Sequence, residues 1–91
     1  MSIKVQLPPI LRPVIGGERF LNAEGTSIGA VLTDLAKKHP ALGLHLFDER
    51  GGVRHNIVFL HDGAMIRAKE ANARQLKPGD EVVITNALAG G

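Results

Sequence analysis

The sequence predicts an α+β fold in which one main helix packs across a mixed sheet of about five strands. Near both ends of the chain, hydrophobic residues alternate with polar ones, which is the period of a half-buried strand. In between, apolar residues at positions 28, 31, 32, 35 and 36 follow the period of an amphipathic helix. The resulting order is strand, strand, helix, strand, strand, strand. This order favours a helix layer on one face of a sheet.

Two strands are predicted before the helix. In residues 2–7, Ile, Val and Leu alternate with polar residues, and the pattern stops at Pro8-Pro9. Gly16-Gly17 then offers a turn, and residues 19–23 form a short second strand. We expect a hairpin with a long loop.

The helix is predicted to begin at Ile28, after a cap from Thr26 or Ser27, and to run for about eleven residues. Lysines and a histidine at 37–39 suit the negative end of the helix dipole, and Pro40 prevents continuation. Residues 41–47 are dense in apolar side chains but short. They predict a loop or a single 3₁₀ turn that closes one end of the core.

The remaining segments predict three further strands. Residues 53–61 are apolar on both alternating faces, which indicates a central strand. Asp62-Gly63 is a two-residue hairpin turn that leads into a short partner strand over 65–67. After a polar loop over 68–75 and a turn over 76–80, residues 81–85 form the last strand. We expect the first and last strands to pair in parallel at the centre of the sheet.

The amino-acid composition excludes several kinds of site chemistry. The 91 residues contain no cysteine and only three aromatic residues, so aliphatic side chains must build the core. Without cysteine there is no disulfide and no thiolate nucleophile, and any sulfur chemistry needs sulfur from outside. No signal sequence or membrane span is predicted, which indicates a soluble cytoplasmic protein. The formal charge of +2 does not imply nucleic acid as a partner.

The chain ends on Gly90-Gly91, directly after the last strand and a lead of small residues. Two residues without Cβ can enter a narrow channel, so the terminal carboxylate is a candidate substrate for another enzyme. The alternative is a disordered end without a role. We therefore predict a domain over 1–86 and a flexible tail over 87–91, which reaches about 20 Å from Asn86 when extended.

The chain resembles the sulfur-carrier branch of the ubiquitin-like β-grasp fold, the ThiS/MoaD family, over nearly its whole length. The resemblance rests on the order of elements, on the approach to the last strand over 76–82, and on Gly90-Gly91. Within that group it is most similar to the CysO-type carriers of cysteine biosynthesis. The features of this closer similarity are Leu7-Pro8-Pro9-Ile10-Leu11-Arg12-Pro13, Gly16-Gly17, the stretch over 28–35 and the Ala89-Gly90-Gly91 end.

The resemblance implies a carrier that is a substrate of other enzymes and not itself an enzyme. A ubiquitin-activating-like partner would adenylate Gly91 with ATP, and sulfide or a protein persulfide would convert the activated carbonyl to a thiocarboxylate. A cysteine synthase homologue would then accept the sulfur, and a metalloprotease would release cysteine. Related carriers serve thiamine thiazole or molybdopterin synthesis, and ubiquitin-like modifiers use the same tail. No phosphate-binding loop occurs in the chain, and no cofactor is expected to bind it.

Four tail residues are the candidate site. Gly91 is the site of adenylation and thiocarboxylate formation, while Gly90 and Ala89 allow close approach of a partner. Leu88 is the one large apolar residue of the tail. Leu88 is a candidate docking contact, and the alternative is that it packs on its own domain. CysO-type carriers often have a smaller residue at this place, so the partner that binds Leu88 can differ from theirs.

Three other residue groups are candidate sites. His55 and His61 share a face of the predicted strand but lie about 20 Å apart, too far to bind one metal ion. The positive residues over 67–77 could form a basic patch near the tail that attracts an acidic partner. The favoured alternative is a solvated loop. Arg12 has no assigned chemistry beyond fixing the first loop. The members of the basic group are Arg67, Lys69, Arg74 and Lys77.

Overall fold

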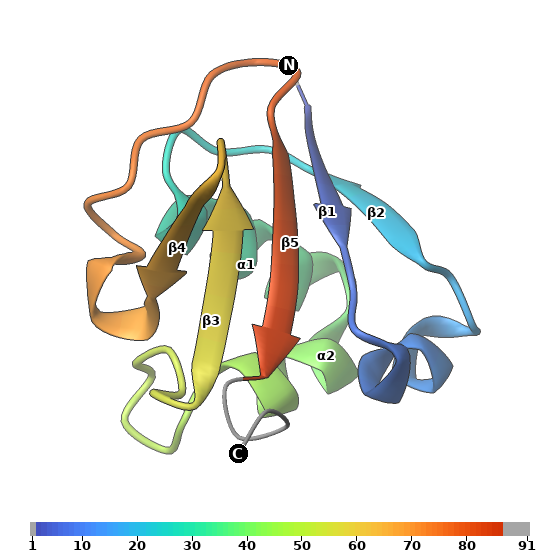
Figure 1. The fold of residues 1–91 in the computed structure, drawn as a ribbon. Helices are drawn as coiled ribbons and strands as arrows, with labels where there is room; N and C mark the ends of the chain where they lie inside the picture. Colours follow the sequence, from blue (N-terminus) through green and yellow to red (C-terminus); the bar gives the residue numbers. More distant parts are fainter. Residues whose placement is uncertain (1, 87–91) are drawn as a thin grey trace.

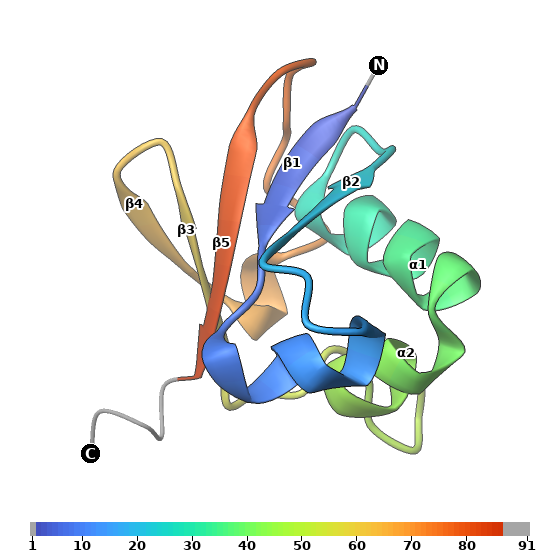
Figure 2. The same ribbon diagram turned by 90° about the vertical axis from the view of Figure 1, so that its right-hand side faces the viewer.

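The computed structural model describes residues 2–86, which form a five-stranded mixed sheet with helices on one face (Figures 1 and 2). The strand order is β2-β1-β5-β3-β4. The strands are β1 (Ile3–Gln6), β2 (Phe20–Ala23), β3 (Ile57–His61), β4 (Ala64–Arg67) and β5 (Glu81–Asn86). The α-helices are α1 (Ile28–Lys38) and α2 (Pro40–Leu46), and the 3₁₀ helices are η1 (Pro9–Ile15) and η2 (Ala68–Glu70).

Strand β5 is the centre of the sheet. It runs parallel to β1, with Val82 opposite Val5, and antiparallel to β3, with Ile84 opposite Phe59. The parallel pairing of the first and last strands is therefore confirmed. The last residue of β5, Asn86, lies opposite Ile57, the first residue of β3. The chain thus leaves the sheet at the end where β3 begins.

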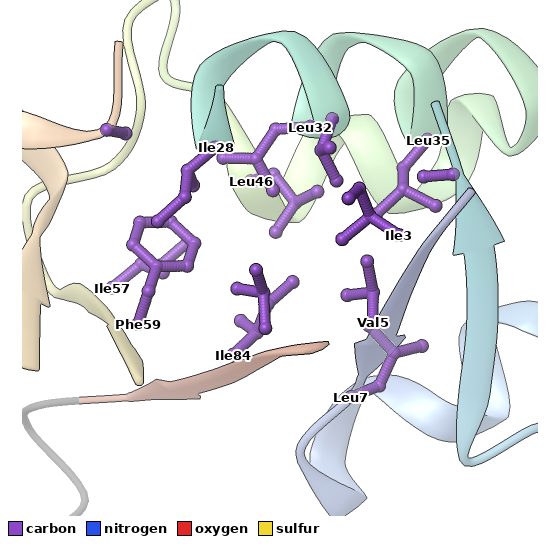
Figure 3. Packing of buried hydrophobic residues seen from close by; sticks show 14 of the residues in the cluster. Ile3, Val5, Leu7, Ile28, Leu32, Leu35, Leu46, Ile57, Phe59 and Ile84 are labelled. Atoms are coloured by element: carbon purple, nitrogen blue, oxygen red, sulfur yellow. The ribbon is translucent and has the colours of Figure 1, made fainter. Parts of the chain in front are cut away.

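Helix α1 covers the sheet as predicted. The Ser27 hydroxyl accepts a hydrogen bond from the backbone N–H of Ala30 at 3.1 Å, which satisfies a donor at the helix start. The apolar stripe of α1 faces the inward side chains of β1, β3 and β5 (Figure 3). Phe59 is fully buried in this core, and the rest of the cluster is mainly aliphatic. The labelled members in Figure 3 are Ile3, Val5, Leu7, Ile28, Leu32, Leu35, Leu46, Ile57, Phe59 and Ile84.

The prediction of a loop or 3₁₀ turn over 41–47 is wrong, because Pro40–Leu46 is an α-helix. Proline suits the first position of a helix, where the backbone N–H has no partner inside the helix. Leu42 and Leu46, four residues apart, both point into the core and are fully buried. Tertiary burial therefore stabilises a helix too short to form alone.

Three other boundaries differ from the prediction. The segment after Pro8 winds into η1 and is not an open loop; the Arg12 Nε–H donates to the Leu7 carbonyl at 3.1 Å and ties the start of the segment to β1. Residues 53–56 are not part of β3, and Val53 makes only an isolated bridge to Phe47. The predicted polar loop over 68–75 begins with η2.

The predicted turns are confirmed. Asp62 and Gly63 have φ angles of 52° and 78°, the left-handed pair that a tight hairpin between β3 and β4 requires. Before β5, the backbone N–H of Asp80 donates to the Lys77 carbonyl at 3.0 Å. Among residues 2–86, no helix has the length and apolar character needed to cross a membrane.

Candidate functional site

The predicted site residues Leu88, Ala89, Gly90 and Gly91 lie outside the residues that the structure describes. The structure shows how the chain arrives at them. Val82 and Ile84 are buried on the helix-covered face of β5, while Val83 and Thr85 are half-buried on the other face. Strand β5 pairs with β1 as far as Val83 and with β3 as far as Asn86, so it stays in the sheet until Asn86.

A groove lies at the end of the sheet where β5 stops. Its volume is about 320 Å³, and Ile84 and Thr85 of β5 form part of its lining. The start of η1, helix α2 and the end of β5 gather at this end of the molecule (Figures 1 and 2). We call it the tail-end groove; the further lining residues from the first loop and from α2 are Pro8, Ile10, Leu11, Leu44 and His45.

The rim of the tail-end groove combines exposed apolar side chains with positive charge. Ile10 is 74% exposed and Leu44 is 73% exposed. Arg54 also lines the groove, with Asn56 and Ile57 beside it. Its Nε and Nη2 donate to the Leu44 carbonyl at 3.3 and 3.0 Å, which holds the guanidinium at the rim. Among the described residues that line the groove, none is Asp or Glu.

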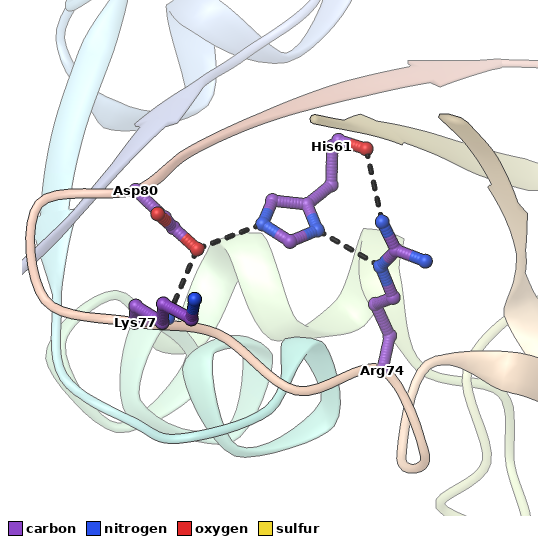
Figure 4. Close-up of polar contacts among 4 residues, drawn as sticks. All are labelled: His61, Arg74, Lys77 and Asp80. Atoms are coloured by element: carbon purple, nitrogen blue, oxygen red, sulfur yellow. Dashed lines mark hydrogen bonds and ion pairs between the residues drawn. The ribbon is translucent and has the colours of Figure 1, made fainter. Parts of the chain in front are cut away.

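At the opposite end of β5, three polar side chains form a closed cluster (Figure 4). The Arg74 Nε–H donates to His61 Nδ1 at 2.9 Å, and His61 Nε2 lies 2.8 Å from an Asp80 carboxylate oxygen. Because Arg can only donate, Nδ1 must accept, so the Nε2–H donates to Asp80. Arg74 Nη2 also donates to the His61 carbonyl at 3.3 Å. The cluster joins the segment before β5 to the end of β3.

Two carboxylates have lowered pKa values. The backbone N–H of Lys77, followed by the His61 hydrogen bond, lowers the pKa of Asp80. The hydrogen bond from Lys38, followed by the one from the Glu24 backbone N–H, lowers the pKa of Asp34. Both groups therefore favour the ionised form in the folded protein.

The structure separates residues that the sequence grouped. His55 is exposed and precedes β3, so the prediction that it shares a strand face with His61 is wrong. Arg74 contacts His61 and Lys77 contacts Asp80 near the start of β5, whereas Arg67 lies opposite Val58, which faces Thr85 near the end of β5. A single basic patch near the tail is therefore not formed. Within residues 2–86, no three His, Asp or Glu side chains are placed to hold one metal ion.

The tail-end groove was missed by the sequence reasoning. The sequence connects Ile10 only with the family similarity of the Leu-Pro-Pro-Ile-Leu-Arg-Pro segment, and it predicts a loop or a 3₁₀ turn around Leu44. The helical spacing of Leu42 and Leu46 was a usable signal, since it leaves Leu44 pointing away from the core.

Comparison with known proteins places this architecture in a known group. The ThiS family model matches residues 5–91. Sulfur carrier protein CysO of Mycobacterium tuberculosis is 33% identical over 93 aligned residues, covering all of both chains. The SAMP1 structure from Haloferax volcanii has a TM-score of 0.81 at 26% identity, with both chains fully covered. CysO in the Amycolatopsis orientalis BexX/CysO complex has a TM-score of 0.80 at 25% identity, covering 98% of this chain and 99% of that one.

The fold, with its central parallel pair of terminal strands and its helix-covered face, defines a ubiquitin-like β-grasp domain. The chain belongs to the ThiS family, as its motifs predicted. It is a sulfur carrier protein of the ThiS and CysO type.

Proposed function

We propose that this carrier holds sulfur as a thiocarboxylate on Gly91 and delivers it for cysteine biosynthesis. The observation that carries the proposal is that the family similarity runs through residue 91, and so includes the glycine pair itself. The full-length similarity to CysO supports the assignment to cysteine over thiazole or molybdopterin.

The chemistry begins with a poor electrophile. A partner enzyme transfers AMP from ATP to the Gly91 carboxylate, releases pyrophosphate and leaves a mixed anhydride. Sulfide then attacks the carbonyl carbon, and AMP departs with the bonding electron pair. ATP is thus bound and consumed by the partner, and the carrier supplies only its carboxylate. Leu88, Ala89 and Gly90 lie next to the reacting group and would contact the partner's channel.

The partners follow from this chemistry. An adenylating sulfurtransferase loads the tail, and a cysteine synthase homologue accepts the sulfur before a metalloprotease releases the product. The structure of CysO in complex with BexX supports the proposal that such a carrier docks on a partner protein.

Intact-mass analysis of the protein purified from its own cells tests the proposal. A fraction of the chains should carry one oxygen-to-sulfur exchange, and fragmentation should place the exchange on Gly91. A chain without any such fraction, even when the cells are starved of cysteine, contradicts the proposal.

Protein modification is the second candidate function, because SAMP1, a small archaeal modifier protein, is among the structural neighbours. As a modifier, this chain would use the same activated Gly91, but a lysine amine of a target protein would replace sulfide as the nucleophile. Isopeptide-linked conjugates that disappear when Gly91 is deleted would support this function.

A further inference from the structure

The tail-end groove is a concave apolar site built from three separate parts of the chain. Ile10 follows Pro9 at the start of η1, Leu44 lies on α2, and Ile84 lies on β5. Single exposed hydrophobic residues are normal on a protein surface. Here, however, two side chains that are about three-quarters exposed line the same cavity from different elements. Exposed apolar side chains that meet at a cavity are typical of interaction sites.

The groove carries the positive charge of an arginine. Arg54 stands at its rim, and His45 lines it on α2. The guanidinium has five N–H donors, and its contacts to the Leu44 carbonyl use two of its three nitrogens, so donors remain for an additional acceptor. Because no carboxylate lines the groove within the described residues, a negative group from another molecule complements it.

The position of the groove relative to the tail indicates the occupant. Thr85 lines the groove, and the chain leaves the sheet one residue later. Gly91 therefore reaches at most about 20 Å from this point when the tail is extended. An enzyme that holds Gly91 in its active site must stand over this end of the carrier, and its surface around the channel entrance faces the groove.

We propose that the tail-end groove docks the adenylating partner through an apolar side chain that enters between Ile10 and Leu44 and an adjacent carboxylate that pairs with Arg54. This inference rests on the proposed function. It also gives a role to the Leu-Pro-Pro-Ile-Leu-Arg-Pro segment, which builds one wall of the groove. Arg12 holds that wall through its hydrogen bond to the Leu7 carbonyl.

Affinity and loading are measured together for two groove variants, Leu44→Asp and Arg54→Glu, with the adenylating enzyme from the same cells. Leu44→Asp places a charge in the apolar groove, and Arg54→Glu reverses the rim charge. Each should raise the Kd for the enzyme about tenfold or more, the range of central interface residues. At carrier concentrations below the Kd, the rate of thiocarboxylate formation with ATP and sulfide should fall by about the same factor as the affinity.

Matched controls lie close to the groove but outside it. Ala41→Asp puts the same charge on an exposed position of α2, and Arg50→Glu reverses an exposed positive charge in the neighbouring turn. Both should bind within twofold of wild type. Urea unfolding shows that each variant is folded, and Leu44→Ser serves as a milder replacement if Leu44→Asp does not fold.

Several results would overturn the docking proposal. Unchanged Kd in both folded groove variants excludes this surface as the contact. Tighter binding by Leu44→Asp would mean that the carrier's own tail, through Leu88, occupies the groove. A dimer of wild-type carrier that Leu44→Asp dissociates, with an unchanged Kd for the enzyme, would assign the groove to a second copy. Wild-type carrier that binds the enzyme but is never thiocarboxylated contradicts the proposed function and leaves the docking result valid.

Discussion

The two ends of β5 differ in whether their side chains are satisfied within the chain. At the start, Asp80, His61 and Arg74 satisfy one another, and the cluster closes the sheet with contacts inside the chain. At the finish, Ile10 and Leu44 expose apolar surface and Arg54 keeps spare donors. Contacts that stabilise the fold therefore lie at one end of the central strand, and the exposed side chains that we propose to bind a partner lie at the other. A carrier needs both, because its domain must stay folded while its tail is handled by enzymes.

The largest expected effect comes from deletion of Gly91. The shortened tail places its carboxylate about 3.5 Å short of the position that the enzyme activates, so thiocarboxylate formation should be abolished. Intact-mass analysis after incubation with the adenylating enzyme, ATP and sulfide measures it. The urea midpoint should equal that of wild type. A shortened chain that is still loaded would refute Gly91 as the reactive residue, and a large loss of stability would break the division between the two ends.

Next in size is the contrast between two leucines of α2, Leu46 and Leu44. Leu46 is fully buried, so Leu46→Ala should lower the free energy of unfolding by about 2–5 kcal/mol through lost burial and a cavity. Leu44 is 73% exposed, so Leu44→Ala should change it by less than about 0.5 kcal/mol. Urea denaturation measures both. Equal losses would mean that the rim of the groove contributes to the core.

A smaller effect is expected at the start of β5. His61→Ala leaves Arg74 and Asp80 without their shared partner and should cost about 1–3 kcal/mol of unfolding free energy. His55→Ala is the matched control, because His55 is exposed, and it should stay within about 0.5 kcal/mol. The loading rate at saturating enzyme should be the same in both variants. A loading defect specific to folded His61→Ala would show that this end also meets the partner.

The smallest effect is a pH dependence. The pKa of Asp80 is lowered in the folded protein from its ordinary value of 3.8. Its contribution to stability is therefore complete above that value and is lost as the pH falls through the folded pKa. The Tm of Asp80→Asn should therefore fall less steeply than that of wild type as the pH is lowered below about 4. An unchanged slope would mean that the Lys77 and His61 hydrogen bonds do not favour the ionised carboxylate.

Asp34 offers an independent check of the same sign. Its pKa is also lowered, by Lys38 and by the Glu24 backbone N–H, and it shares no partner with Asp80. Asp34→Asn should remove a separate part of the acid sensitivity, and the double variant should show the sum of both changes.

Local patterns were sufficient for much of the fold. Ser27 begins α1 and the periodic apolar residues define its length, while Asp62-Gly63 sets the hairpin between β3 and β4. These signals act over a few residues, so they can be recognised without the rest of the chain. The order of the elements predicted the central parallel pair, and the family motifs added the candidate role of Gly91.

Errors arose where distant contacts override local preference. Residues 40–46 are too short to form a helix alone, and they do so because Leu42 and Leu46 are buried against the core. His61 lies on a strand as predicted, but its contacts are with Arg74 and Asp80, which come to it across 13 and 19 positions of sequence.

The sequence by itself determined the family, the turns, the main helix and the glycine end, because each depends on neighbouring residues or on a motif. Only the tertiary structure decided which side chains meet at the two ends of β5. The pairing of the first and last strands brings the segment after β1 to the end of β5, where residues of α2 also line one groove with Ile10 and Arg54. Such a site depends on packing between segments far apart in the chain, and no local pattern encodes it.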